Sequence, residues 1–125
     1  MRIPLIVGNW KMNLTTKEAA SLVEKLKSRL SDIGEVEVAV CPPFTSLETV
    51  AEKCRESGIY VGAQNMFWED QGAYTGEISP VMLKDLGCSY VILGHSERRQ
   101  FFGETNENVS RKVKSALKHK IIPII

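Results

Sequence analysis

Short apolar segments alternate along the chain with longer stretches in which apolar residues recur at helical spacing. The apolar segments predict five strands, at residues 2–7, 36–41, 59–63, 90–93 and 121–125. The first is almost wholly apolar, so we expect it to be buried on both faces of a sheet. The stretches between the strands predict four connecting helices. The pattern is typical of an α/β fold whose strands pair in parallel through right-handed crossovers.

Cap residues predict where these helices begin. Two starts match a capping box, at residues 15–18 (TTKE) and 45–48 (TSLE), in which a threonine and a glutamate satisfy each other's free amide groups. Ser79 precedes Pro80, a favoured residue at the first helical position, and Thr105 is a further cap. Helix ends are predicted at three glycines, Gly34, Gly58 and Gly87.

Two closures of the sheet are compatible with this order. An open doubly wound sheet of five strands is complete at this length, whereas a (β/α)8 barrel needs about 250 residues, so the chain corresponds to half of one. No Gly-rich nucleotide-binding loop follows any predicted strand, which disfavours the open sheet. The sequence stops at the fifth strand, before the loop in which such folds carry functional residues, and this favours the half barrel.

The composition excludes several classes of protein. The 125 residues predict one domain, and 43% hydrophobic with 25% charged residues is ordinary for a globular chain. A net charge of +1 argues against a nucleic-acid or membrane-surface protein, and no apolar run is long enough to cross a bilayer. The three cysteines show no metal-binding spacing, and no secretory signal is evident. We therefore expect a cytoplasmic protein with reduced thiols.

Polar residues cluster directly after the predicted strands, where parallel α/β folds gather their sites. They are Asn9 and Lys11, Gln64 and Asn65, and His95, Ser96 and Glu97. Taken singly, a loop lysine is usually solvated, an asparagine often satisfies loop backbone groups, and a histidine is more often structural. His95, however, directly precedes a helical turn predicted at residues 96–102. Because a helix amino terminus disfavours a protonated imidazole, we expect a neutral His95 that donates a hydrogen bond.

The chain contains four distinctive sequence blocks, which are GNWKMN at 8–13, GAQN at 62–65, GAYTGEIS at 72–79 and YVILGHSERR at 90–99. In this order and spacing they closely resemble the triose-phosphate isomerase family. The resemblance spans residues 1–125 but only the amino-terminal half of the family's TIM (β/α)8-barrel. It implies interconversion of dihydroxyacetone phosphate and D-glyceraldehyde 3-phosphate through an enediolate, in glycolysis and gluconeogenesis, with no cofactor and no metal.

The resemblance assigns a role to several of the clustered residues. It makes Asn9 and Lys11 the substrate-binding pair, with the Lys11 ammonium close to the phosphate and the developing enediolate. His95 resembles the electrophile that donates to the carbonyl and moves protons between the two oxygens. Glu97 resembles the carboxylate partner of Lys11, and Ser96 a supporting residue. A neutral histidine at this position is a known property of the family, so the agreement with the helix argument is not independent support.

The resemblance also implies a homodimer. The predicted loop from Gln64 to Glu77 is similar to a protruding segment whose tip, near Thr75, enters a second subunit beside that subunit's site. We therefore expect Gln64, Asn65, Thr75, Gly76 and Glu77 at the interface. From the residues alone, a long loop that bears aromatic side chains is costly to leave in water.

The family's catalytic glutamate and the lid that covers it follow strands that these 125 residues do not include. A general base contributes ~10²–10⁴-fold to such a rate, so we expect negligible isomerase activity from the 125 residues alone. A complementary carboxyl-terminal half barrel is therefore an expected partner. Two other interpretations stay open, a non-catalytic half-barrel assembly fragment and an open-sheet module that binds phosphate esters.

Overall fold

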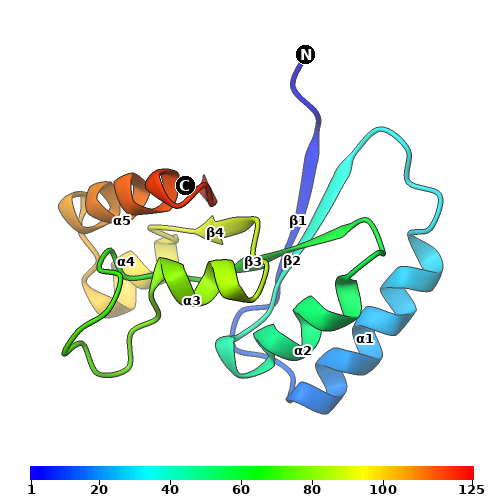
Figure 1. The fold of residues 1–125 in the computed structure, drawn as a ribbon, viewed down its shortest axis with the longest axis horizontal. Helices are drawn as coiled ribbons and strands as arrows, with labels where there is room; N and C mark the ends of the chain where they lie inside the picture. The colour runs from blue at the N-terminus through cyan, green and yellow to red at the C-terminus, as the bar shows by residue number, and fades with distance from the viewer.

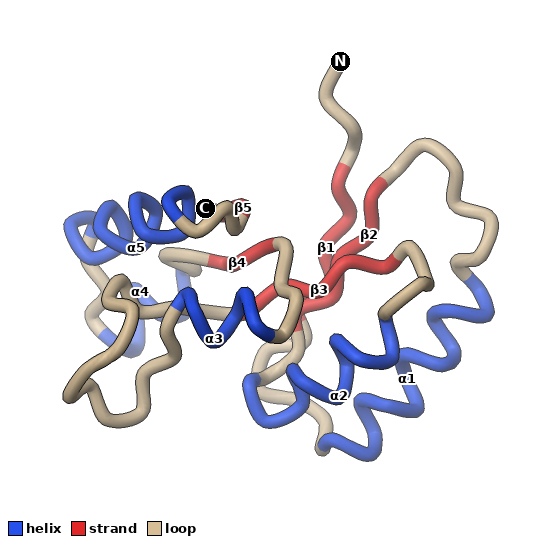
Figure 2. The backbone as a smooth tube through the Cα atoms, viewed as in Figure 1, coloured by secondary structure: helices blue, strands red, loops and turns tan.

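The computed structural model describes residues 1–125 and contains one sheet of five parallel strands (Figures 1 and 2). The strands are β1 (Leu5–Asn9), β2 (Glu37–Cys41), β3 (Ile59–Ala63), β4 (Tyr90–Ile92) and β5 (Ile122–Ile124). They lie across the sheet in chain order, with no switch point where the order reverses. The sequential order is that of a half barrel, and it removes the open doubly wound alternative.

Five helices occupy the four connections. They are α1 (Thr16–Arg29), α2 (Phe44–Cys54), α3 (Pro80–Asp85), α4 (Ser96–Phe102) and α5 (Asn106–Lys118). The connection from β4 to β5 contains both α4 and α5, because Gly103 adopts a left-handed conformation, with φ of 64°, that ends α4. In Figure 1, α1 and α2 lie side by side beneath β1 and β2, whereas α5 lies beside β5 at the other end of the sheet.

The cap residues predict most helix starts correctly. Thr15 forms the expected capping box with Glu18, and Ser79 caps α3 with Pro80 in its first turn. Thr105 caps α5. The capping box predicted at residues 45–48 is wrong.

The wrong capping box lies inside α2. This helix begins two residues earlier than predicted, at Phe44, with Pro43 instead of Thr45 at the cap position and no side-chain cap. The extended backbone of Pro43 (ψ 154°) already sets the entry to the helix, and its carbonyl accepts a hydrogen bond from the amide of Ser46 at 3.0 Å. Thr45 and its partner glutamate therefore lie within the first two turns.

Of the three predicted helix ends, one agrees with the structure, one lies beyond the helix and one is wrong. Gly87 follows α3 directly and has φ of 81°, as a glycine stop requires. Gly58 lies three residues beyond the α2 cap at Arg55, also with positive φ, so it serves the turn into β3. The end predicted at Gly34 is wrong, because α1 ends at Arg29 with Leu30 as its cap, and Gly34 has no positive φ.

The hydrophobic core lies between one face of the sheet and the helices. Its members in β3 alternate along the strand, at Ile59, Val61 and Ala63, and its helical members include Val23 and Leu83. The expectation that the first strand is buried on both faces is wrong. Ile6 in β1 is 58% exposed, because β1 is an edge strand with a neighbour on one side only.

The opposite, concave face of the sheet holds a polar contact. The Tyr90 hydroxyl donates a hydrogen bond to the Glu37 carboxylate, and the ring of Tyr60 packs edge-on against that of Tyr90 with centroids 5.9 Å apart. Burial, aided by the carboxylate, raises the pKa of Tyr90 to about 12. The tyrosine therefore remains a hydrogen-bond donor throughout the neutral range.

The three cysteines, Cys41, Cys54 and Cys88, are buried free thiols, as predicted. Burial raises the pKa of Cys41 and Cys88 to about 12 and that of Cys54 to about 11. None of the helices has the length and apolar character required to span a membrane.

Candidate functional site

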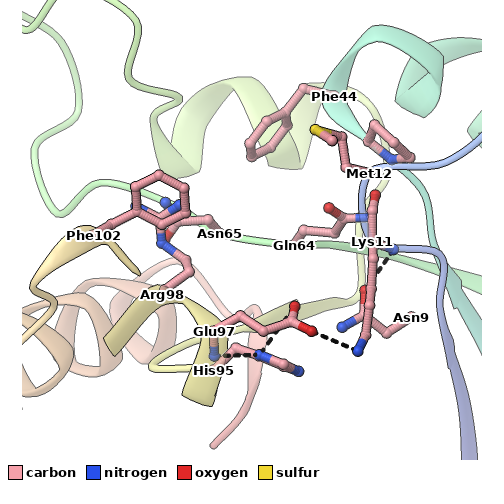
Figure 3. Close-up of a pocket in the computed structure, with 11 residues that line it drawn as sticks. Asn9, Lys11, Met12, Phe44, Gln64, Asn65, His95, Glu97, Arg98 and Phe102 are labelled. Carbon is pink, nitrogen blue, oxygen red and sulfur yellow. Dashed lines mark hydrogen bonds and ion pairs between the residues drawn. The ribbon is translucent and has the colours of Figure 1, made fainter. Parts of the chain in front are cut away.

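A pocket of about 310 Å³ lies where the strands end (Figure 3). Asn9 is the last residue of β1, Gln64 follows β3, and His95 precedes α4, so three separate connections meet here. The lining residues are Asn9, Lys11, Met12, Pro43, Phe44, Gln64, Asn65, His95, Glu97, Arg98 and Phe102. Parallel strands bring their carboxyl ends to one edge, which is why residues 86 positions apart become neighbours.

Lys11 is held in an unusual backbone conformation. Its φ is 54°, in the left-handed region that residues other than glycine rarely adopt. Two side chains hold it there: the Asn9 carboxamide oxygen accepts from the Lys11 amide at 3.0 Å, and Gln64 Nε2 donates to the Lys11 carbonyl at 2.9 Å. Gln64 Nε2 also donates to the carbonyl of Cys41 at 2.8 Å. Asn9 and Gln64 thus fix the loop from which the ammonium projects.

The Lys11 ammonium pairs with Glu97 at the start of α4. Lys11 Nζ lies 2.6 Å from Glu97 Oε1, and both side chains are about half exposed. The hydrogen bond from Lys11 lowers the pKa of Glu97 below its ordinary value. The carboxylate is therefore ionised at neutral pH, and it lies between the lysine and the imidazole of His95 (Figure 3).

His95 is the cap residue of α4. Its Nδ1 accepts a hydrogen bond from the amide of Glu97 at 3.1 Å, so Nδ1 carries no proton. The tautomer that fits this contact is neutral and protonated at Nε2, which leaves Nε2–H free to donate. The Glu97 carboxylate also stands 3.6 Å from Nδ1. The pocket therefore presents a fixed cation and a neutral N–H donor together.

The remaining predicted residues separate into two groups. Asn65 lines the pocket beside Gln64, but its side-chain oxygen accepts from Lys112. Ser96 is exposed on α4 and is not among the lining residues. The predicted interface residues of the loop tip, Thr75, Gly76 and Glu77, are exposed and also lie outside the pocket.

The aromatic residues of the long loop pack on one another. Phe67 stacks on Trp68 with centroids 4.1 Å apart and contacts Tyr74 at 4.5 Å. Arg111 of α5 lies over the Trp68 ring at 5.3 Å. Phe67 and Trp68 are only partly exposed, so of the three aromatics Tyr74, at 45%, leaves the most apolar surface free.

Sequence reasoning missed a buried ionic cluster behind the pocket. Lys112 of α5 is only 5% exposed and contacts Asn65 and Glu104, and Glu104 also accepts from Arg98. The sequence carries a signal for it, because Lys112 falls on the same helical stripe as the apolar Val109 and Ala116. A lysine on an apolar stripe indicates a buried ion pair. The structure contains no group of three or more His, Cys, Asp or Glu side chains that could hold a metal ion.

Comparison with known proteins gives a consistent result. A family model described as Triosephosphate isomerase matches residues 4–125. Curated relatives of that name include those of Caldanaerobacter subterraneus subsp. tengcongensis, 57% identical over 125 residues, Roseiflexus castenholzii, 56%, and Clostridium botulinum, 56%. Each alignment covers 100% of this chain but 49% to 50% of the relative. The chain spans about half the length of the curated relatives it matches.

Proposed function

Because the chain belongs to the triosephosphate isomerase family, we propose that its pocket is the electrophilic part of a site that interconverts dihydroxyacetone phosphate and D-glyceraldehyde 3-phosphate. The five strands and their helices form half of a TIM barrel. The observation that carries the proposal is the meeting of Lys11 and His95 in one pocket, bridged by Glu97.

The chemistry of the two groups suits this reaction. Isomerisation moves one proton from carbon 1 to carbon 2 of the triose phosphate and a second proton between its two oxygens. His95 Nε2–H donates to the carbonyl oxygen and, as a neutral imidazole, passes protons between the oxygens of the enediolate. The Lys11 ammonium stabilises the negative charge that develops on those oxygens and the charge of the phosphate. Asn9 and Gln64 support this by fixing the Lys11 loop.

The base that removes the carbon-bound proton is not assigned to any of these 125 residues. The one carboxylate in the pocket, Glu97, is paired with Lys11. We therefore propose that residues 1–125 as a separate polypeptide have negligible isomerase activity. A complementary carboxyl-terminal half barrel supplies the base and covers the concave face of the sheet.

A joined chain tests the proposal. In it, residues 1–125 are followed by the carboxyl-terminal half of the Caldanaerobacter subterraneus relative, and isomerisation is followed with a coupled dehydrogenase. The joined chain is expected to turn over, and Lys11→Met or His95→Gln is expected to lower kcat/KM by about 10²-fold or more. Lys17→Met and His119→Gln, which lie outside the pocket, serve as matched controls. Parental kcat/KM in both pocket variants would contradict the assignment.

The alternative, a non-catalytic half-barrel assembly fragment, rests on the apolar surface that the half barrel leaves exposed. Ile6 is 58% exposed and Ile122 54% exposed, on strands at opposite edges of the sheet. A folded joined chain without turnover, alongside an active full-length relative, would favour this alternative.

The wider biological setting belongs to the same proposal. Family membership supports a role in glycolysis and gluconeogenesis and a homodimer in which the loop from Gln64 to Glu77 contacts the second subunit. The free thiols support a location in the reducing cytoplasm. Sedimentation of the joined chain and of a variant with the loop tip shortened tests the dimer.

A further inference from the structure

The short helix that carries the site is poorly anchored by apolar contacts. α4 has seven residues and none of them is buried. It nevertheless carries Glu97 in its first turn and has His95 as its cap. A helix without a buried apolar face depends on polar contacts for its position, because burial supplies most of the stability of an ordinary helix.

The best-buried of those polar contacts come from behind the pocket. Arg98 Nε donates to Glu104 Oε2 at 3.0 Å, and the other oxygen of Glu104 accepts from the ammonium of Lys112. The Glu104 and Lys112 side chains are 3% and 7% exposed. The same ammonium donates to the Asn65 side chain at 2.9 Å.

Lys112 is therefore connected to both sides of the pocket. Through Glu104 and Arg98 it holds α4, which carries the carboxylate and the imidazole. Through Asn65 it holds the end of β3, where the neighbouring Gln64 fixes the loop of Lys11. We propose that Lys112 is a positioning residue, whose buried ammonium sets the imidazole and carboxylate on α4 relative to the Lys11 loop. The inference rests on the proposed function for its catalytic readout only.

The burial of Lys112 and Glu104 explains why their contacts can fix the position of α4 relative to the Lys11 loop. Charges removed from water interact more strongly and are screened less by salt than exposed ones. The pair between Lys11 and Glu97 crosses the same gap, but its side chains are about half exposed, so water and salt screen their attraction. The buried cluster thus determines the distance across the pocket, and the exposed pair follows it.

The test uses Lys112→Met in the joined chain, with Lys114→Met as the matched control, since Lys114 is an exposed lysine on the same helix. At a temperature where all variants are folded, Lys112→Met is expected to lower kcat about 10–100-fold while KM changes less than about threefold. It is also expected to shift the NMR signals of the His95 ring nitrogens, which are assigned by comparison with His95→Gln. Lys114→Met is expected to change neither readout.

Folded Lys112→Met with parental kcat and unshifted His95 signals would overturn the proposal. Should the single variant fail to fold because the buried Glu104 carboxylate keeps only Arg98 of its two cationic partners, the double variant Lys112→Met/Glu104→Gln removes the carboxylate charge and carries the same expectations. If the joined chain is inactive, the proposed function fails, but the NMR signals of His95 still test whether Lys112 positions the imidazole. If the His95 signals shift in Lys112→Met but not in Lys114→Met, the positioning role is supported. If they do not shift in Lys112→Met, the positioning role is refuted.

Discussion

The close contact at Gly62 allows a quantitative test of the packing on the concave face of the sheet. A Cβ atom at this position would lie 2.8 Å from the Sγ of Cys41 and 3.1 Å from the Cβ of Tyr90. Gly62 has no positive φ, so alanine is not strained by the backbone itself. Gly62→Ala therefore tests steric overlap, above all with the sulfur of Cys41 and to a smaller extent with Tyr90.

The expected change in unfolding free energy follows from this overlap, which is closest at the Cys41 sulfur. Overpacking a filled site costs about 1–3 kcal/mol, and the reduced freedom of the unfolded chain returns roughly 0.4–1 kcal/mol, so Gly62→Ala is expected to cost about 1–2 kcal/mol. Cys41→Ala deletes one buried atom and is expected to cost about 1 kcal/mol. In the double variant the new methyl group occupies the space of the sulfur, and we expect the two costs to cancel in large part.

Urea unfolding of the joined chain measures these energies, with tryptophan fluorescence as the signal and equal protein concentrations throughout. We expect the double variant to be less destabilised than the sum of the single variants by about 1 kcal/mol or more. Residual crowding against Tyr90 prevents full recovery. Additive costs, within about 0.5 kcal/mol, would refute the reasoning, because they would show that the sulfur is not what the added methyl group meets.

Three further predictions concern the helix caps, the ion pair and the thiols. Thr15→Ala removes the capping box with Glu18 and is expected to cost about 1 kcal/mol in urea unfolding; an unchanged midpoint would contradict the cap. The pKa of Glu97 is lowered by Lys11, so the stabilisation is present above the ordinary value of 4.5 and is lost as the pH falls through the folded value. The unfolding midpoints of the parent and Glu97→Gln should therefore converge in acid, and a constant difference down to pH ~2 would exclude this linkage. Burial raises the pKa of two thiols to about 12 and of the third to about 11, so iodoacetamide at pH ~8 should label the unfolded chain but not the folded one, as mass spectrometry will show.

The features that the sequence predicts best are those whose partners lie within one helical turn. The box of Thr15 and Glu18 forms as predicted, because nothing nearby competes with it. The same pattern at residues 45–48 fails because Pro43 fixes the backbone first and starts the helix earlier. Ile6 is exposed for a different reason, because β1 is an edge strand with β2 on one side only, and the order of strands across a sheet is not a local property of the sequence.

The candidate site shows the same division between local and distant contacts. Polar residues gather at the carboxyl ends of parallel strands, and this rule predicts from the sequence alone that Lys11 and His95 lie close together. It does not reveal that Asn65 turns toward Lys112, 47 positions further along the chain. Such a pairing depends on where α5 lies relative to the residues that follow β3, and no local sequence pattern predicts that placement.

The left-handed backbone of Lys11 has a consequence for any engineering of this protein. A residue with a side chain pays about 1 kcal/mol to adopt that conformation, whereas glycine adopts it freely. The exposed ion pair lost in Lys11→Gly offsets little of this difference. A library of the joined chain randomised at this position and sorted for heat resistance will therefore enrich glycine. On the proposed function, one sorted for turnover will retain lysine, so that the two selections place opposite demands on a single backbone angle.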